Sequence, residues 1–526
     1  MLNQCFSFLR RFLGLVSSIQ MATLRSFDVL VVGGGNAALV SALSAKQSGA
    51  TVAIFEAAAQ THRGGNSRYS SGIFRIPHDG LDSVIPLLDT SGREDLQYCR
   101  MGPYTRDMYK HDMERTSKGR CNREQLDVML ENAFDTVAWM KQELGVRWQL
   151  PLGKFFDRKK VISAQGGMVD LPPWDTIMAV NEGTGLMEDL WTAVEKAGIT
   201  IFYEAPVSDL IVNGDTVEGL KVRQRNATTE FFGQVVLACG GFQASPRLRR
   251  QYLGEGWDLV SLRGSRFNTG IMMEKAISAG AAVAGHFGGC HAVPHDRDAP
   301  EVLEPEHTDK MSRYSFPYSI MVNLEGRRFL DEGEDHFSLT YAKTGAAIGR
   351  QTGATAFQIF DQKTLHLLEP RYRIASPVQD DTLEGLAKKM GVDVKTFLET
   401  IHEFNAATSD SYLEKFDAFK LDGVSTRYKL AIAKSNWAQP IDQGPFVAYA
   451  VTCGITFTYG GLKVDSTAAV INQEGLPMPG LWAAGEIAGG FFAFNYPGGA
   501  GLTKGAVFGK IAGRAAACRA KKLKIT

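Results

Sequence analysis

The chain has 526 residues, which is more than one hydrophobic core usually holds, so its length favours two domains. Its 57 basic side chains (Lys and Arg) balance 57 acidic ones (Asp and Glu), so no excess of positive charge points to a nucleic-acid partner. The seven cysteines form no C-x-x-C pair, which argues against a zinc site, an iron–sulfur cluster or a disulfide framework and favours a reducing compartment.

The N-terminal segment, residues 1–26, contains Arg10, Arg11 and Arg25 but no acidic residue, and its leucines and phenylalanines alternate with serines. This pattern is typical of an amphipathic mitochondrial transit peptide; the simpler interpretation is an unstructured leader, with Met21 as the true start. No apolar run in the chain reaches the roughly 18 residues that a membrane span needs. We expect a cytoplasmic protein, with a mitochondrial location as the alternative.

The first structured unit follows directly, in the stretch FDVLVVGGGNAALVSALSAKQSGATVAIFEA, Phe27–Ala57. Its apolar and small residues predict a buried strand at Phe27–Val32, a helix at Asn36–Ser48 and a second parallel strand at Thr51–Glu56. Such a unit predicts an α/β fold of the Rossmann type.

The turn between this strand and helix fits the pattern G-x-G-x-x-A. Gly33 permits the tight turn, Gly35 lets the backbone approach a pyrophosphate, and Ala38 lets helix and strand pack closely. A carboxylate at the end of the second strand can accept hydrogen bonds from ribose hydroxyls, which a turn without a ligand does not explain. The predicted dinucleotide contacts of this unit are Gly33, Gly35, Asn36, Ala37, Ala38 and Glu56.

The glycine pattern does not distinguish NAD from FAD, but the C-terminal region does. Pro479–Gly490 places Glu486 after a predicted strand, and Gly498–Gly513 starts a second helix from a glycine turn. The N-terminus of that helix can stabilise negative charge on a reduced isoalloxazine ring. A second cofactor-facing segment so far along the chain is expected when one domain, interrupted by another, encloses the long FAD molecule.

The composition and residue patterns along the rest of the chain predict that a second domain is inserted into the first. Residues 27–285 are predicted to form the first part of a Rossmann-like FAD-binding domain, including an antiparallel meander. Residues 286–450 are richer in His, Pro and aromatic side chains and are predicted to be an inserted α+β capping domain. Residues 451–520 return to strand, glycine turn and helix, and are predicted to complete the FAD-binding domain.

Seven stretches carry a resemblance to a known superfamily: VVGGGNAAL, GGNSRYSSG, VVLACGGF, VNLEGRRFLDE, TYGGLKVD, GLWAAGE and YPGGAGLTKGAVFG. They resemble the fumarate reductase/succinate dehydrogenase flavoproteins. No histidine lies between Arg63 and Pro77, the segment that carries the covalent flavin link in the respiratory enzymes, so noncovalent FAD is expected. The further FAD contacts that the resemblance implies are Gly65, Asn66, Ser67, Ser71, Gly72, Val207, Gly240, Gly485, Glu486, Gly501 and Leu502.

The resemblance also shows where this chain departs from fumarate reductases, which use histidines and arginines on a dicarboxylate. Aligned from its downstream end, GEDHFSLTYAKTGAAI places Tyr341 where the proton-shuttling arginine would stand; aligned from its upstream end it places His336 there. Thr456 stands near the later histidine position and Tyr496 at the late arginine position, so both are expected in the substrate pocket. The early histidine is retained as His291.

The motifs RGGNSR, GCHAVP, FLDEGED, TYAK, VTCGITFTYGG and NYPGGAGLT are similar to those of a narrower group, the FAD-dependent tricarballylate dehydrogenases. This resemblance implies an enzyme that desaturates, or in reverse reduces, a carbon–carbon bond beside a carboxylate, most simply in a tricarballylate-like polycarboxylate. Desaturation moves a hydride to flavin and a proton to a protein base, while cations or hydrogen bonds steady the carboxylate.

Five side chains are candidates for this chemistry. Tyr341 is the first choice for the base, on the expectation that nearby arginines lower its pKa, and His336 is the second. His291, Arg68 and Arg328 are expected to hold or neutralise substrate carboxylates. No metal-ligand spacing is present, so no metal is expected.

Two other functions remain open from the sequence. One is a dehydrogenase of a ketosteroid or secondary-metabolite ketone; the other is a flavin-binding subunit with little activity of its own. Two or more arginines facing the flavin would favour a polycarboxylate, whereas an apolar pocket with a tyrosine would favour a ketone. The partner that reoxidises the flavin is expected to be separate: a quinone, an iron–sulfur protein or oxygen.

Overall fold

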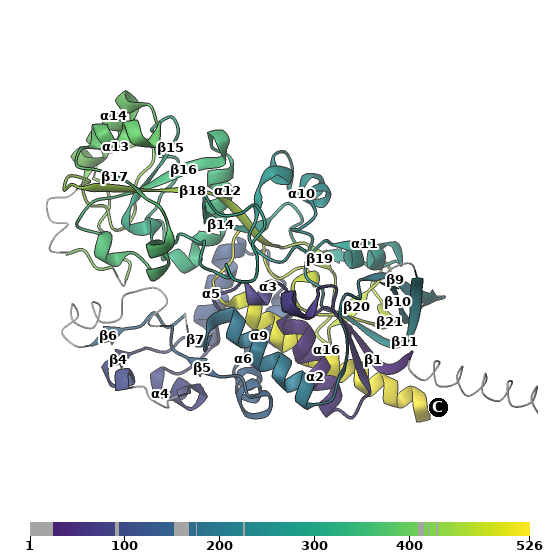
Figure 1. Cartoon of the computed structure of the whole chain (residues 1–526). Helices are drawn as coiled ribbons and strands as arrows, with labels where there is room; N and C mark the ends of the chain where they lie inside the picture. Colours follow the sequence, from purple (N-terminus) through teal and green to yellow (C-terminus); the bar gives the residue numbers. More distant parts are fainter. Residues whose placement is uncertain are drawn as a thin grey trace, which may run out of the picture.

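The computed structural model describes residues 25–89, 94–151, 168–174, 176–224, 227–408, 415–418, 420–427 and 430–525. The predicted leader therefore lies outside the described residues up to residue 24. The described chain forms two lobes, and its N- and C-terminal parts meet in one of them, shown in purple and yellow in Figure 1. Within the described helices, none combines the length and the low polarity that crossing a membrane requires.

The lobe that holds the first and last described residues is built on a sheet in the order β20-β21-β11-β1-β2-β8, to which β10 and β9 add an antiparallel meander. Its strands are β1 (Ser26–Val32), β2 (Val52–Phe55), β8 (Thr200–Phe202), β9 (Val207–Asn213), β10 (Thr216–Gln224), β11 (Ala227–Leu237), β20 (Ala469–Ile471) and β21 (Pro477–Ala483). The central strands β21, β11, β1, β2 and β8 pair in parallel. Since a parallel sheet is covered on both faces, β2 is fully buried, as its unbroken apolar run VAIF predicts.

The chain outside the second lobe also contains nine α-helices and three smaller sheets, β3-β7-β5, β4-β6 and β13-β19, within the described residues. The helices are α2 (Asn36–Gln47), α3 (Gly65–Arg68), α4 (Leu81–Val84), α5 (Arg106–Ser117), α6 (Arg123–Leu144), α9 (Glu182–Lys196), α10 (Pro246–Leu253), α11 (Ile271–Ser278) and α16 (Ala500–Ile525). The small strands are β3 (Ile73–Phe74), β4 (Cys99–Arg100), β5 (Trp148–Gln149), β6 (Val169–Asp170), β7 (Ile177–Ala179), β13 (Val283–Ala284) and β19 (Gly461–Leu462). The predicted strand–helix–strand unit at the N-terminus is confirmed as β1–α2–β2.

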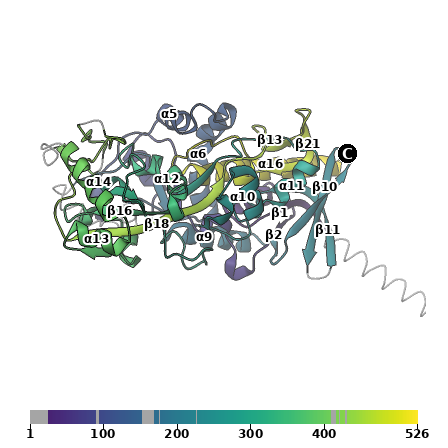
Figure 2. The same cartoon turned by 90° about the horizontal axis from the view of Figure 1, so that it is seen from above.

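The second lobe, green in Figure 1 and at the left in Figure 2, contains a separate sheet. Its elements are β12 (Ser261–Leu262), β14 (Cys290–Asp296), β15 (Ile320–Asn323), β16 (Thr355–Phe360), β17 (Val378–Asp380), β18 (Phe446–Thr458), α12 (Tyr341–Gly349), α13 (Leu383–Met390) and α14 (Val394–Ala407). Strand β18 pairs with β12, β14, β16 and β17. The boundary expected at residue 450 falls inside this strand, which runs unbroken from one lobe toward the other.

Helices α2 and α16, from opposite ends of the chain, lie against each other beneath the sheet (Figure 1). Small residues permit this packing: a β-carbon at Gly509 would lie 2.7 Å from the Ala37 carbonyl oxygen, and one at Gly513 would lie 2.1 Å from that of Ser41. Both distances are far below van der Waals contact. The close approach brings the N-termini of both helices to the same end of the sheet.

We predict that Gly513→Ala destabilises the protein. In an isolated helix this change would add about 1 kcal/mol of helix stability, but here the new methyl group collides with the Ser41 carbonyl, and overpacking costs about 1–3 kcal/mol. The thermal unfolding midpoint at equal flavin content should fall. Gly102→Ala is the matched control because a β-carbon there meets no atom within 4 Å. A Gly513→Ala midpoint equal to or above wild type would contradict the packing.

Candidate active site

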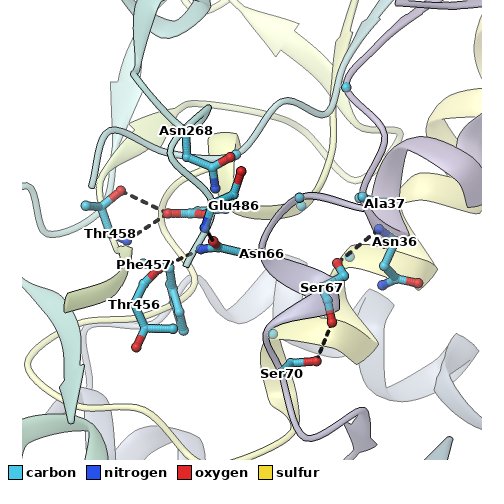
Figure 3. Close-up of a pocket in the computed structure, with 18 of the residues that line it drawn as sticks. Asn36, Ala37, Asn66, Ser67, Ser70, Asn268, Thr456, Phe457, Thr458 and Glu486 are labelled. Atoms are coloured by element: carbon cyan, nitrogen blue, oxygen red, sulfur yellow. Dashed lines mark hydrogen bonds between the residues drawn. The ribbon is translucent and has the colours of Figure 1, made fainter. Parts of the chain in front are cut away.

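A cavity of about 290 Å³ opens where the two helix N-termini, the end of β18 and α12 meet. It is lined by both lobes, so the residues expected to hold a cofactor and those expected to hold a substrate share one space. The residues predicted from sequence that line it are Gly33, Gly35, Asn36, Ala37, Glu56, Gly65, Asn66, Ser67, Ser71, Val207, Gly240, His291, Tyr341, Thr456, Gly485, Glu486, Tyr496, Gly501 and Leu502. Figure 3 shows the middle of this cavity.

The glycine turn before α2 has the geometry of a phosphate-binding turn. Gly33 has φ of +112°, and a β-carbon there would lie 2.5 Å from the Ala238 carbonyl oxygen, so glycine is required. The Asn36 backbone N–H donates to Ser67 Oγ at 3.0 Å (Figure 3). A β-carbon at Gly35, by contrast, would come no nearer than 3.4 Å to Ser67 Oγ. The space above Gly35 is thus open to a ligand that faces the helix N-terminus.

Two buried polar groups at this end of the cavity call for a polar ligand. Glu56 is 5% exposed; the Ala58 N–H donates to it at 2.8 Å, and burial raises the pKa of its carboxyl to about 7. Asn36 Oδ1 is buried and has no hydrogen-bond partner among the described residues. Ribose hydroxyls and a cofactor chain supply the donors that such groups lack. These two acceptor groups therefore fit a dinucleotide.

The C-terminal wall of the cavity is held by Glu486. The Thr458 backbone N–H donates to Glu486 at 2.8 Å (Figure 3). The Gln243 side-chain amide also donates to Glu486, at 3.3 Å. Burial raises the pKa of this carboxyl to about 7. Asn66 connects this wall to the glycine-rich segment, because its amide donates to the Thr456 carbonyl at 2.6 Å.

Lys504 is a cavity residue that the sequence reasoning missed. It lies in the first turns of α16, is 4% exposed, and its Nζ donates to the carbonyls of Gly485 (3.2 Å) and Ala488. Burial lowers the pKa of this amine to about 7. Its position in the sequence, just after the glycine turn, could have predicted this place, because a cation at the start of a cofactor-facing helix fits an anionic ligand.

Aromatic side chains surround the other end of the cavity. We call this set the aromatic box: His291, Tyr314, Phe337, Tyr341, Phe457, Phe492 and Tyr496. The His291 ring stacks on Phe457 at a centroid distance of 4.9 Å and meets the edges of Tyr341 at 4.9 Å and Tyr496 at 5.0 Å. Tyr341 also packs on Tyr314 at 4.8 Å. These contacts make a dry, rigid surface around the expected reaction site.

Burial sets the protonation of this box. It raises the pKa of Tyr341 well above 10, and the nearby positive charge of Arg263 offsets this only in part. The expectation that cations lower this pKa is thus wrong for the structure. Burial, with a smaller contribution from Arg263, holds the pKa of His291 well below its usual value, so His291 is neutral. Among the described residues, His291 Nδ1 has no hydrogen-bond partner.

Tyr496 differs from Tyr341 in having a fixed partner. Its hydroxyl oxygen accepts the Gly501 backbone N–H at 2.9 Å, at the start of α16. Burial raises the pKa of this hydroxyl to about 12, so it keeps its proton. Because its oxygen already accepts a bond, its O–H is available as a donor to a ligand in the cavity.

Arg263 is the second cavity residue that the sequence reasoning missed. It follows β12 and carries no motif, yet among the described residues that line the cavity it is the one arginine. Its guanidinium donates to the buried carboxylate of Asp309, to Ser312 Oγ at 2.9 Å and to Thr456 Oγ1 at 3.2 Å. The positive charge of Arg263 is therefore paired with the negative charge of Asp309.

Three predicted catalytic residues do not reach the cavity. His336 is buried beside it, its Nδ1 accepts from Trp174 at 3.4 Å, and burial lowers its pKa to about 3. Arg328 forms a buried ion pair with Glu332 inside the second lobe. Arg68 donates to the carbonyl of Thr61 at 2.9 Å and points away from the cavity lining.

Two predicted cofactor residues act through packing instead of lining the cavity. Ala38 is fully buried in α2, where the small side chain keeps the helix close to the sheet. A β-carbon at Gly72 would lie 2.6 Å from the backbone of Glu182, so this glycine allows two chain segments to touch.

The strand–glycine turn–helix unit, the buried carboxylate at the end of β2 and a second helix N-terminus from the far end of the chain define a flavin-dependent oxidoreductase. The profile of the family described as FAD binding domain matches residues 28–502. The chain belongs to this family, in the fumarate reductase/succinate dehydrogenase flavoprotein superfamily, and its cofactor is FAD.

Known proteins similar to this chain carry different activities. It is 28% identical over 500 residues to the probable fumarate reductase Ifc3 of Shewanella frigidimarina, covering 93% of this chain and 74% of that protein. It is 26% identical over 563 residues to the 4-oxocyclohexanecarboxylate 2-dehydrogenase of Sinomonas cyclohexanicum, covering 94% and 93%. Its fold is similar to that of 3-ketosteroid delta1-dehydrogenase from Sterolibacterium denitrificans, with a TM-score of 0.69, 20% identity and coverage of 94% and 100%. The likeness to tricarballylate dehydrogenases rests on the sequence motifs alone.

We predict that Gly35→Val abolishes FAD binding and leaves the fold intact. The valine side chain has room beside Ser67 and Gly64 but fills the space above the turn, where a phosphate would lie. The ratio of flavin absorbance to protein should fall to background, while circular dichroism stays as in wild type. Gly102→Ala serves again as the control. Full flavin content in folded Gly35→Val would place the phosphates elsewhere.

Proposed function

We propose that this protein transfers hydride between FAD and a carbon–carbon bond that lies next to a carbonyl group. The single observation that carries the proposal is the character of the cavity: an aromatic box with one arginine, whose charge Asp309 cancels. A polycarboxylate brings two or three negative charges, and burying them without matching cations is costly. A ketone, with at most one carboxylate at the cavity mouth, suits these walls better.

This proposal takes up the ketone alternative in preference to the tricarballylate-like polycarboxylate that the motifs favour. The relative from Sinomonas cyclohexanicum, whose name describes a cyclic ketone that carries a carboxylate, supports it over 94% of the chain. The fumarate reductase relative supports the hydride transfer at a carbon–carbon bond, which the ketone and polycarboxylate proposals have in common. The third possibility is a flavin-binding subunit with little activity. We do not favour it, because the aromatic box contains both a candidate proton-transfer group, Tyr341, and a candidate carbonyl-binding group, Tyr496.

Tyr496 is proposed to bind the carbonyl oxygen of the substrate. Its oxygen accepts the Gly501 N–H, which leaves its O–H as a donor for a ligand. The start of α16 lies beside it, and the partial positive charge there would stabilise the negative charge that develops on the carbonyl oxygen. His291, neutral and with a spare ring nitrogen, would provide a second hydrogen bond.

Tyr341 is proposed to move the proton at the carbon next to the carbonyl. Bound FAD supplies the acceptor or donor of the hydride at the neighbouring carbon. The neutral phenol of Tyr341 can give its proton in the reductive direction, whereas desaturation requires the phenolate, which the raised pKa disfavours. Desaturation should therefore quicken as pH rises through the neutral and alkaline range, and reduction should not.

We also propose the form of the FAD linkage, the role of the inserted lobe and the class of the electron acceptor. FAD is proposed to be noncovalent, since residues 63–77 contain no histidine; acid precipitation should leave the yellow colour in the supernatant, and a yellow pellet would contradict it. Residues 286–450 are proposed to cap a cofactor held by residues 27–285 and 451–520. Electrons are proposed to pass to a separate quinone, iron–sulfur protein or oxygen.

We predict that ketones, and not tricarboxylates, exchange electrons with the bound flavin. In an anaerobic screen followed by flavin absorbance, 4-oxocyclohexanecarboxylate and its uncharged parent cyclohexanone should bleach the oxidised enzyme, and cyclohexenone should restore the colour of the reduced enzyme. Tricarballylate and succinate should do neither. Bleaching by tricarballylate without any response to ketones would restore the polycarboxylate assignment.

We predict that Tyr341→Phe slows flavin reduction by the best substrate by about a hundred- to ten-thousand-fold, the usual share of acid–base catalysis. The ring packing against His291 is kept, so flavin content and stability should not change. The matched control is His336→Gln, a buried residue outside the cavity lining. A fast Tyr341→Phe together with a slow His336→Gln would transfer the role to His336.

A further inference from the structure

We propose that Asp309 determines which substrate group can bind at the wall that faces the aromatic box: its carboxylate masks Arg263, so that this wall admits a carbonyl group and rejects a carboxylate, which would have to stay at the cavity mouth. This inference rests on the proposed function and deepens it. Asp309 lies in the connection between β14 and β15 and was not recognised from the sequence. It acts through Arg263 and is therefore a positioning residue, not a catalytic one.

The first argument is the geometry of the carboxylate. Asp309 is 0% exposed, and both of its oxygens are engaged. Oδ1 accepts from the Arg263 guanidinium and from Ser312 Oγ at 3.1 Å, and Oδ2 accepts from Arg371 Nη1 at 2.9 Å and from Ser71 Oγ. Such a saturated, buried carboxylate stays ionised and fixed in position.

The second argument is that Arg263 has few donors left for a ligand. Its Nε donates to Ser312 Oγ at 2.9 Å, its Nη1 to Thr456 Oγ1 at 3.2 Å, and its Nη2 to Asp309 and to the Tyr69 carbonyl at 3.3 Å. These bonds occupy four of the five guanidinium N–H groups, so a substrate carboxylate that contacts Arg263 with both oxygens would have to displace one of them. It would also meet the electric field of the Arg263–Asp309 ion pair, which attracts an anion much more weakly than an unpaired cation would.

The third argument is the charge balance around the wall. Arg371, the other arginine on Asp309, lies over the Tyr314 ring at 4.5 Å and donates to Glu369 at 3.2 Å. Glu182 adds a negative charge at longer range. The group formed by Arg263, Arg371, Asp309 and Glu369 is thus neutral as a whole. Removing the charge of Asp309 alone would leave one positive charge directly behind the aromatic box.

The test is Asp309→Asn in the FAD-loaded enzyme. Asparagine keeps the shape and an acceptor oxygen for Arg263 but removes the negative charge. Succinate and tricarballylate are titrated, and binding is followed by the change in the flavin absorption spectrum, which needs no turnover. We expect both anions to bind about ten- to a hundred-fold more tightly than to wild type, in a salt-dependent manner, while affinity for cyclohexanone changes little.

Two controls separate masking from a general change in charge. Glu332→Gln also removes a buried, arginine-paired carboxylate, but outside the cavity, and should not alter anion affinity. The double variant Asp309→Asn, Arg263→Met should lose the gain. An equal gain in Glu332→Gln, no gain in folded Asp309→Asn, or a gain that survives loss of Arg263 would each overturn the proposal.

If Asp309→Asn does not fold, titrating the wild-type protein with the same anions still tests the proposal. If Asp309 masks Arg263, succinate and tricarballylate should not perturb the wild-type flavin spectrum at concentrations where cyclohexanone saturates it. Tight anion binding by wild type would overturn the masking. Failure of ketones to reduce the flavin would contradict the proposed function instead, so the two claims are tested separately.

Discussion

The packing of α16 on α2 is the contact on which the rest of the structure depends. The two helices approach so closely because the carbonyls of Ala37 and Ser41 face Gly509 and Gly513. Since they come from parts of the chain on either side of the inserted lobe, their packing joins those two parts into one lobe. It also sets two helix N-termini side by side, and these supply the positive potential that a phosphate-bearing, redox-active cofactor needs.

Burial is the second constraint, and it acts on chemistry through protonation. In the aromatic box it keeps Tyr341 and Tyr496 neutral and His291 uncharged, so this end of the cavity recognises ligands by hydrogen bonds and not by charge. The paired Arg263 and Asp309 fit the same principle, because a buried cation is tolerated when its partner lies beside it. Together these features favour a carbonyl substrate over a polycarboxylate.

The sequence predicts the parts of the molecule whose information is local. The strand, turn and helix at Phe27–Ala57 and the second turn before α16 follow from glycine spacing and apolar runs, and both lie at the cavity. Arg263 and Asp309 could not be found in this way, because they are distant in sequence, carry no motif and meet only in the folded chain. The choice between Tyr341 and His336 required the register of the 3₁₀ turn Phe337–Leu339 before α12, which spacing alone does not fix.

The most direct test of this account is an experimental structure of the FAD-loaded protein with a bound ketone. The account predicts the pyrophosphate above Gly35, the isoalloxazine ring at the start of α16, and the ketone oxygen in contact with the Tyr496 hydroxyl, with Tyr341 facing the neighbouring carbon and the Arg263–Asp309 pair intact. An isoalloxazine ring away from the start of α16, or a ligand held by Arg263 after its pair with Asp309 has opened, would contradict it.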